Sequence, residues 1–289
     1  LARCFNSVAS KDVMGKAIPK PKRGRLTGWA TGAAGLLSVV VGIALMLPVT
    51  GRLDEALLGT LLVAAGMLWL IAAAIYAQVP EQPGEVGDRR NPLEALQHLS
   101  ILVTDKPFRR FIITRALLMC SALSAPFYVA LAQRNYGSPA YLLGAFVVSA
   151  GVASLVSGPV WGRYADMSSK RVMVAAALVT SGTGIATFLI DRFVPEISGT
   201  VWFLPLAYFV LSVAHSGVRV GRKTYVVNLA TGNKRTDYVA ISNTTIGVLL
   251  LMVGSVGLLT PIITNAGVIG LLALLGLGGA ALGTTMVDT

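Results

Sequence analysis

The sequence predicts an all-α polytopic membrane protein with eight transmembrane helices. Of its 289 residues, 54% are hydrophobic and only 13% are charged, whereas a soluble domain usually carries about 25% charged residues. Several apolar stretches are long enough to cross a bilayer, and the basic residues cluster in the segments between them. These observations together indicate that much of the chain is surrounded by lipid.

A helix that crosses the hydrocarbon core of a bilayer needs about 20 consecutive, mostly apolar residues. The segments that meet this criterion are 27–48, 56–79, 110–132, 140–161, 172–190, 200–219, 238–260 and 265–284. The first and the last are rich in glycine, which lets two helix backbones approach closely within a membrane.

The basic residues predict the orientation of these spans. The net charge of +11 could suggest nucleic-acid binding, but the basic residues lie in short blocks between apolar runs, so no nucleic-acid partner is expected. Twenty of the 24 Lys and Arg residues fall in segments 1–26, 80–110, 162–171 and 219–235, which lie on one side of the membrane. Because cytoplasmic loops are enriched in Lys and Arg, we expect an integral protein of the plasma (inner) membrane with both termini of this chain cytoplasmic.

The two cysteines, Cys4 and Cys120, have no CxxC partner and no histidine nearby in the sequence. They are expected to be small buried hydrophobic residues and not part of a disulfide or a metal site. No cofactor or metal is therefore predicted, and coupling to protons or another ion is left open.

A long polar segment, residues 80–108, separates the first two spans from the other six. Its part 91–103 predicts an interfacial helix with Asn91 as the N-cap, although a solvated linker helix fits the same pattern. The segment 1–28 weakly resembles 215–243, since each passes from a small-residue helix end through basic residues to another helix. Two repeated bundles joined by such a linker are typical of secondary transporters.

The segment GRYADMSSKR, residues 162–171, concentrates charge between two apolar runs. It resembles the cytoplasmic signature of the major facilitator superfamily, in which glycine and three further residues precede Asp, and a small residue then precedes two basic ones. The residues that fit are Gly162, Asp166, Ser169, Lys170 and Arg171. The match is partial, because the family often has a basic residue where Met167 stands and glycine where Ser169 stands.

The resemblance extends over essentially the whole chain and implies a bundle of the major-facilitator type. Family members have two six-helix halves, so 1–79 is expected to be a remnant of the N-terminal half, 80–108 the cytoplasmic linker, and 109–289 the C-terminal six-helix bundle. The chain begins with Leu instead of Met, and its first residues read as the end of an apolar helix. We therefore expect a fragment that starts near the end of helix 4 and lacks about the first four helices.

Two stripes of small residues predict a close contact between two spans. On span 140–161 and just beyond it, residues at steps of four are Ala150, Ser154, Gly158 and Gly162. On span 27–48, the similar stripe consists of Gly28, Gly32, Gly35, Ser38 and Gly42. Such stripes can pack backbone against backbone, and the resemblance implies that these two helices meet across the two halves.

Lys170 and Arg171 open a helix at its N-terminus, where the helix dipole disfavours cations. Lipid phosphates or the Asp166 carboxylate are expected to offset this charge. We expect Asp166 to face the start of the first span near Arg25 and Thr27, which would form a cytoplasmic latch between the two halves. The alternative is that the segment only anchors the protein at lipid headgroups.

Ionisable and polar residues inside spans are costly and often functional. On span 200–219, four such residues follow one another at steps of four, three and four and therefore share one helix face. The resemblance places this span and 110–132 beside the central cavity, which gives the substrate-cavity candidates Arg115, Pro126, Tyr208, Ser212, His215 and Arg219. In the alternative interpretation, Arg115 snorkels to lipid headgroups and His215 bonds a neighbouring helix. Asn243 is expected to be a helix-packing residue.

The sequence thus predicts a secondary active transporter that moves a small solute by alternating access, with an anionic solute as one option. The expected partners are the lipid bilayer and this small-molecule substrate, and a monomeric state is compatible with the sequence. A sensor or scaffold with a transporter fold is the alternative. An intramembrane enzyme is less favoured, because the sequence has no GxSG motif, no GxxxxGK[ST] loop and one intramembrane histidine, so no enzymatic activity is predicted.

Overall fold

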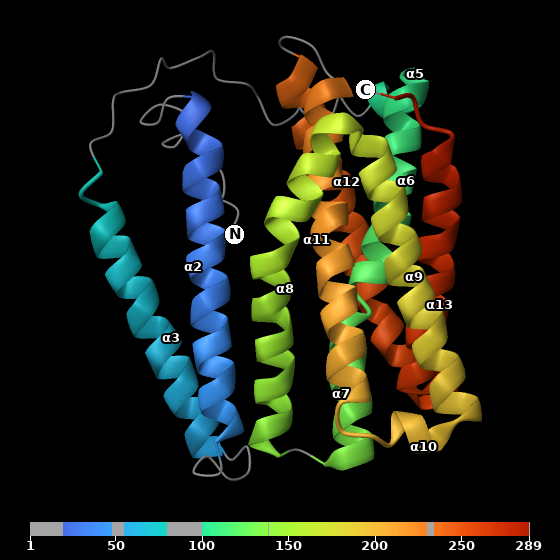
Figure 1. Ribbon diagram of the computed structural model, residues 1–289. Helices are drawn as coiled ribbons and strands as arrows, with labels where there is room; N and C mark the ends of the chain where they lie inside the picture. Colours follow the sequence, from blue (N-terminus) through green and yellow to red (C-terminus); the bar gives the residue numbers. More distant parts are fainter. Residues whose placement is uncertain (1–19, 48–54, 80–99, 138, 230–233, 289) are drawn as a thin grey trace.

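The computed structural model describes residues 20–47, 55–79, 100–137, 139–229 and 234–288, and every regular element within these ranges is a helix (Figure 1). The long helices are α2 (Lys20–Met46), α3 (Glu55–Tyr76), α6 (Lys106–Ala122), α7 (Ala125–Tyr136), α8 (Ala140–Met167), α9 (Ser169–Phe193), α11 (Phe203–Leu229), α12 (Lys234–Gly254) and α13 (Thr260–Thr284). The short elements are α5 (Ile101–Thr104), α10 (Pro195–Ser198) and the 3-10 helix η3 (Ser255–Leu259). A long helix stands at each predicted span, with α6 and α7 together forming the third.

Among the described residues, six helical stretches are long and apolar enough to cross a membrane, and one of them joins α12, η3 and α13. The helix α3 illustrates their character, because it has no buried residue. Leu62 and Leu70, for example, are 74% and 73% exposed. A surface of this kind is unfavourable in water and favourable in hydrocarbon, so the predicted all-α membrane fold is confirmed.

The third predicted span, 110–132, consists of two helices. The Asp105 side chain caps α6 by accepting a hydrogen bond from the Phe108 N–H at 3.0 Å. The helix α6 ends at Ala122, and α7 begins at Ala125 with Pro126 in its first turn. Proline suits this position because it has no N–H to leave unpaired there and its φ angle is already helical. The third span is therefore interrupted just before Pro126.

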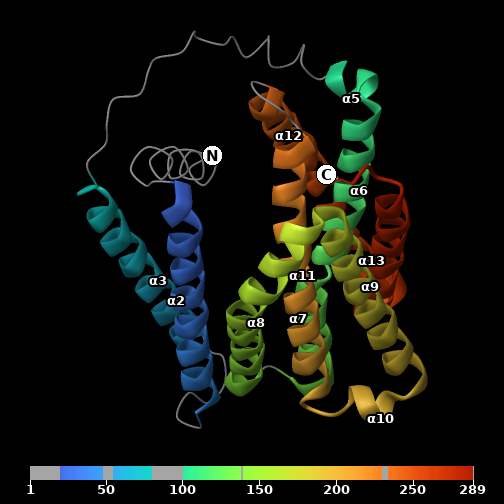
Figure 2. The same cartoon turned by 45° about the horizontal axis from the view of Figure 1, so that its top comes forward.

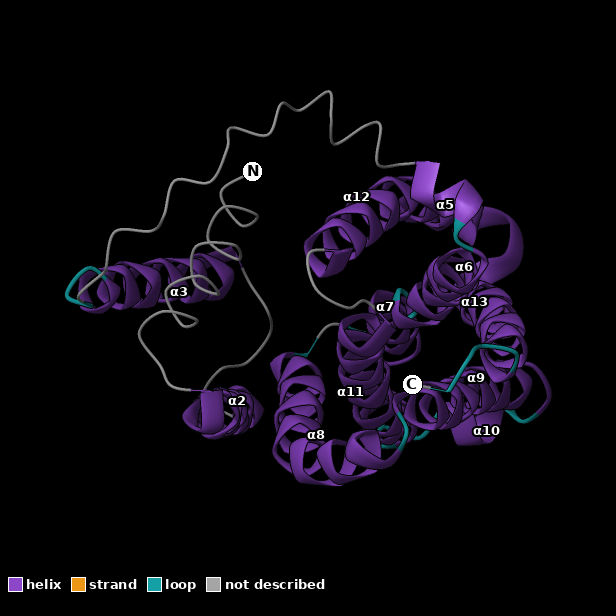
Figure 3. Ribbon diagram, turned by 90° about the horizontal axis from the view of Figure 1, so that it is seen from above, coloured by secondary structure: helices purple, strands orange, loops and turns teal. Residues whose placement is uncertain are grey.

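The helices from α6 to α13 form one bundle, which Figure 3 shows along its axis. Within it, glycines bring α13 close to both α6 and α9. A Cβ atom on Gly279 would lie 2.9 Å from the Leu117 Cβ, and one on Gly184 would lie 2.7 Å from the Ala273 Cβ. The glycine-rich last span thus serves close helix packing, as its sequence predicts.

The two larger apolar clusters among the described residues lie at opposite ends of the bundle. One lies near the C-terminus and includes Phe111 and Tyr225, whose rings stack with centroids 5.1 Å apart. The other includes Tyr128 and Phe146 and lies toward the opposite end. We call the end of the bundle at which α8 meets α9, and where the C-terminus lies, the signature end (Figures 1 and 2).

The helices α2 and α8 run antiparallel and touch through glycines. A Cβ on Gly35 would lie 3.1 Å from the Gly151 carbonyl oxygen, and one on Gly144 would lie 2.5 Å from the Gly42 carbonyl oxygen. Because backbone atoms face each other at both levels, the predicted contact between these two spans is present.

The level of the contact on α8 differs from the prediction, however. The contact uses Gly144 and Gly151, which are seven residues apart, and Gly158, two turns further on the same face, takes no part in it. A Cβ on Gly158 or on Gly32 would meet no atom of the described structure within 4 Å. The close contact therefore ends before the signature end, where Figure 1 shows α8 leaning away from α2.

Two predicted loops are largely helical. Only Ser168 separates α8 from α9, in place of a turn over 162–171. Likewise α11 continues to Leu229, so Arg222 lies in a helix and not in a loop over 219–235. Hydropathy marks where the lipid ends, whereas a helix continues as long as its backbone hydrogen bonds are maintained. Most of the predicted interfacial helix 91–103 lies outside the described residues, apart from its end at Ser100 and in α5.

Candidate functional site

Arg115 turns across the bundle toward α12. It lies nine residues after the start of α6, which is about 14 Å along the helix. Its Nη1 donates a short hydrogen bond to Ser242 Oγ, and its Nη2 donates to Asn243 Oδ1 at 3.1 Å. These partners argue against snorkelling, because the guanidinium is directed to a neighbouring helix. Asn243, expected to be a packing residue, is instead a polar partner of Arg115.

A second arginine, Arg222 of α11, joins this site. Its Nη1 donates to the thioether sulfur of Met119 at 2.6 Å, and sulfur is a weak acceptor for a charged donor. Met119 stands four residues after Arg115 on the same face of α6, and the charge of Arg222 acts on Arg115. The sequence did not indicate Arg222 as a site residue, because its polar surroundings predict a loop over 219–235.

Among the described side chains, no carboxylate forms an ion pair with Arg115 or Arg222. The ion pair that these side chains do form joins Lys170 and Asp288. The Nε of Arg115 is buried and has no hydrogen-bond partner among the described residues. An unpaired buried donor on a charged group is unfavourable. The site therefore carries excess positive charge and an unused donor.

Arg219 extends the positive character along α11, and His215 lies within reach of the same charges. His215 is half-buried, and the charges of Arg219 and Arg222 both act on it. Arg219 is exposed and donates from Nη2 to Ser216 Oγ of its own helix at 2.8 Å. Arg222 thus links Arg219 and Arg115 in one electropositive region, with His215 beside the two arginines of α11.

The remaining predicted cavity residues lie elsewhere along the bundle. Tyr208 packs edge-on against Phe146 and Tyr128, with ring centroids 5.0 and 6.4 Å apart, so it belongs to an aromatic cluster. Ser212 lies half-buried on α11 between Tyr208 and His215, and Pro126 is exposed at the start of α7. The structure places His215 and Arg219 near Arg222, whose charge also acts on Arg115, and it places Tyr208 in the aromatic cluster instead.

A narrow apolar crevice adjoins Arg115 and leaves room only for a water-sized group. Its α6 wall includes Ala116 and Met119, and its α12 wall includes Ile246 and Leu250. Ile246 is one helical turn beyond Ser242, the hydrogen-bond partner of Arg115. The crevice therefore begins where the polar contacts between α6 and α12 end.

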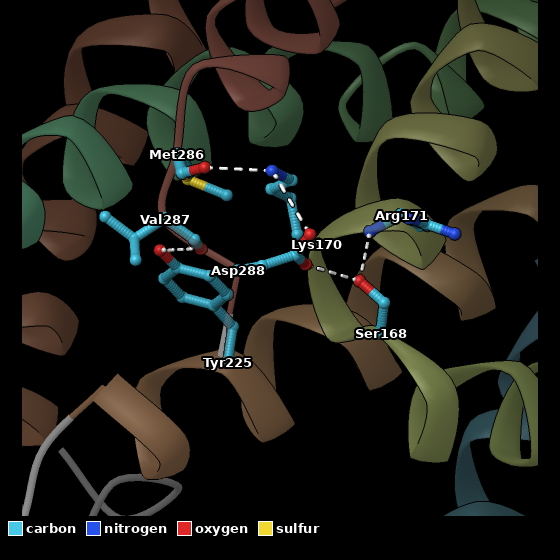
Figure 4. A network of polar contacts seen from close by, with 7 residues as sticks. All are labelled: Ser168, Lys170, Arg171, Tyr225, Met286, Val287 and Asp288. Carbon is cyan, nitrogen blue, oxygen red and sulfur yellow. Dashed lines mark hydrogen bonds and ion pairs between the residues drawn. The ribbon is translucent and has the colours of Figure 1, made fainter.

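At the signature end, the C-terminal tail contacts the start of α9 (Figure 4). The Ser168 hydroxyl accepts a hydrogen bond from the Arg171 N–H at 3.3 Å and donates to Asp288 Oδ1 at 2.8 Å. Lys170 Nζ lies 3.5 Å from Asp288 Oδ2 and donates to the Met286 carbonyl at 3.0 Å. A carboxylate thus does offset the cations at this helix start, and the one found there is Asp288, which is far from Asp166 in the sequence.

The tail is also fixed by its neighbours on α11 and in the core. Tyr225 donates from its hydroxyl to the Val287 carbonyl at 3.0 Å, and Met286 is buried within the apolar cluster. The hydrogen bond from Ser168, together with the charges of Lys170 and Arg171, lowers the pKa of the Asp288 carboxyl below its usual value. The tail therefore joins the ends of α9 and α11.

The structure does not describe the side chains that would form the predicted latch. Gly162 and Asp166 lie in the last turns of α8, and Arg25 and Thr27 lie in the first turns of α2, but their side chains are outside the described ones.

Cys4 also lies outside the described residues, whereas Cys120 is a free, buried thiol on α6. Among the described residues, no three His, Cys, Asp or Glu side chains are grouped as a metal site would require.

A bundle of membrane helices whose charged side chains turn inward is the organisation of a membrane transport protein. The sequence model of the Major Facilitator Superfamily matches residues 1–248 of this chain. The chain therefore belongs to the Major Facilitator Superfamily, in agreement with the signature at 162–171. No curated protein matches the sequence significantly.

Proposed function

We propose that the protein is a secondary active transporter that moves a small solute across the plasma (inner) membrane by alternating access, with both termini of this chain in the cytoplasm. The observation that carries this proposal is Arg115, which is directed toward α12 and keeps a buried, unpartnered Nε. A charged group with an unused donor inside a membrane bundle is suited to a solute that arrives and leaves. Membership of a transporter superfamily supports the same conclusion.

Counterflow in proteoliposomes tests transport without knowledge of the coupling ion. Liposomes containing the full-length protein are preloaded with each member of a panel of organic acids, amino acids, sugars and organic cations. The external solution holds the same compound in radiolabelled form. We expect accumulation of at least one compound above protein-free liposomes.

The matched variants are Arg115→Gln and Arg192→Gln, which remove one arginine each. Arg192 is exposed in the last turn of α9, at the end of the bundle away from the signature end. We expect Arg115→Gln to reduce counterflow about tenfold or more, since a hydrogen bond to a charged group typically contributes about 1.5–3 kcal/mol, and Arg192→Gln to leave it unchanged. No counterflow by the wild-type protein for any compound would favour a sensor or scaffold instead.

We further propose that Asp166 forms a latch with the start of α2 near Arg25 when the signature end closes. Two observations support this arrangement: α2 and α8 are in contact at Gly35 and Gly151, and this contact ends before the signature end. A rocking of one half against the other about that contact would bring the two helix ends together. Crosslinking of an Arg25→Cys/Asp166→Cys pair that rises when the transported solute is added would support the latch, and equal crosslinking in all conditions would refute it.

A further inference from the structure

We propose that the solute is an organic anion that carries an apolar group, held with its charge between Arg115 and Arg222 and its apolar part against the apolar walls of the crevice between α6 and α12. This assignment rests on the transport function proposed above and names the class of solute. It follows from two features that lie next to each other: an electropositive region without described carboxylates and an apolar crevice.

The charge of the ligand follows from the two arginines. Two guanidinium groups repel each other unless an anion lies between them or water screens them. Arg222 has a thioether sulfur as its hydrogen-bond partner, and Arg115 has an unpartnered Nε. A guanidinium presents its donors in a planar fork that fits the oxygens of a carboxylate, sulfonate or phosphate. An anion would therefore occupy the unused donors and relieve the repulsion.

The apolar part of the ligand follows from the walls of the crevice. Ala116, Cys120, Ile246 and Leu250 contribute apolar surface from α6 and α12. Met119 belongs both to this wall and to the arginine site, because its sulfur accepts the hydrogen bond from Arg222. The polar and apolar parts of the site thus share one side chain. The crevice itself is narrow, so an apolar group of the ligand would lie against these walls at its open side.

The experiment measures equilibrium binding to the full-length protein in detergent by isothermal titration calorimetry. The probes are benzenesulfonate and benzoate, which combine a ring with an anion. The comparison compounds are methanesulfonate, which lacks the ring, benzyl alcohol, which lacks the charge, and benzyltrimethylammonium, which reverses it. We expect both ring anions to bind, and each comparison compound to bind about tenfold more weakly or worse. Failure of both ring anions to bind, or equal binding of the cation, would overturn the assignment.

Variants separate the two parts of the site. We expect Arg222→Gln to weaken both ring anions about tenfold or more, and Ala116→Leu, which narrows the crevice, to weaken them without changing methanesulfonate binding. Arg192→Gln, the matched control, should bind the probes as the wild type does. If Arg222→Gln fails to fold, as judged by gel filtration, Arg222→Lys replaces it and should also weaken binding, because a lysine lacks the planar fork. Unchanged binding in either folded variant contradicts the proposal.

The counterflow assay keeps this assignment distinct from the transport function. Counterflow of neutral or cationic compounds, with no binding of either ring anion, would refute the anion site and leave transport intact. Binding of the ring anions without counterflow of any compound would refute transport and leave the anion site as that of a sensor.

Discussion

The contact between α2 and α8 predicts an effect of adding a single methyl group. In the variant Gly144→Ala, the new Cβ would lie 2.5 Å from the Gly42 carbonyl oxygen and 2.7 Å from the Met46 Cγ. The methionine side chain can rotate away, but the carbonyl oxygen is part of the α2 backbone. The two helices must therefore move apart, and the contact of the first two spans with the bundle weakens.

The magnitude follows from two opposing contributions. Overpacking of this kind typically costs about 1–3 kcal/mol, whereas replacing glycine by alanine in a helix interior gains about 1 kcal/mol. Gly158→Ala is the matched control, because it receives the same gain on the same helix and its Cβ meets no described atom within 4 Å. The difference between the two variants is thus the cost of overpacking alone, about 1–3 kcal/mol.

Thermal unfolding of the full-length protein in detergent measures this difference. At about 2–4 °C per kcal/mol for a chain of this size, Gly144→Ala should melt at least about 2 °C below Gly158→Ala. Gly151→Ala should behave like Gly144→Ala, since its Cβ would lie 2.8 Å from the Gly35 carbonyl oxygen. Melting of Gly144→Ala at or above the temperature of Gly158→Ala would show that α2 and α8 are not packed through these glycines.

Three further results are expected. Arg115→Lys keeps the charge but cannot hold Ser242 and Asn243 together, so counterflow should fall about tenfold, and wild-type rates would contradict the role given to these contacts. Asp288→Asn should speed hydrogen exchange at the start of α9, where Asp288 contacts Ser168 and Lys170, and unchanged exchange would show that the tail does not hold this helix end. Because the pKa of Asp288 is lowered in the folded protein, its contribution should be complete above the unfolded-state pKa of about 4 and disappear as the pH falls below that value. Protection of the α9 start that declines already between neutral and mildly acidic pH would contradict this assignment.

The existence and the approximate position of the spans could be predicted from the sequence, because each depends on a local run of apolar residues. Their ends could not. Arg222 lies in a polar stretch that reads as a loop, yet the α11 helix continues through it to Leu229. Polarity reports the limit of the lipid, and a helix can extend beyond that limit into the aqueous phase.

The contacts of the site were predictable only in part. Arg115 is conspicuous in the sequence because an arginine inside an apolar run is unusual. Its partners Ser242 and Asn243 lie 127 and 128 residues away, and no local pattern connects them. In the same way, Asp288 is remote from Lys170 in the sequence, so no local pattern indicates their ion pair. Small residues occur along the length of α8, and only the position of α2 decides that Gly144 and Gly151 form the contact.

The central claim is that this bundle carries an organic anion past Arg115, and counterflow of radiolabelled benzenesulfonate tests it most directly. This probe is permanently ionised, so little of it crosses a bilayer unaided. The account predicts accumulation in proteoliposomes with the wild-type protein and with Arg192→Gln, and loss of accumulation with Arg115→Gln. Equal accumulation by wild type and Arg115→Gln, or none by the wild type, would contradict it.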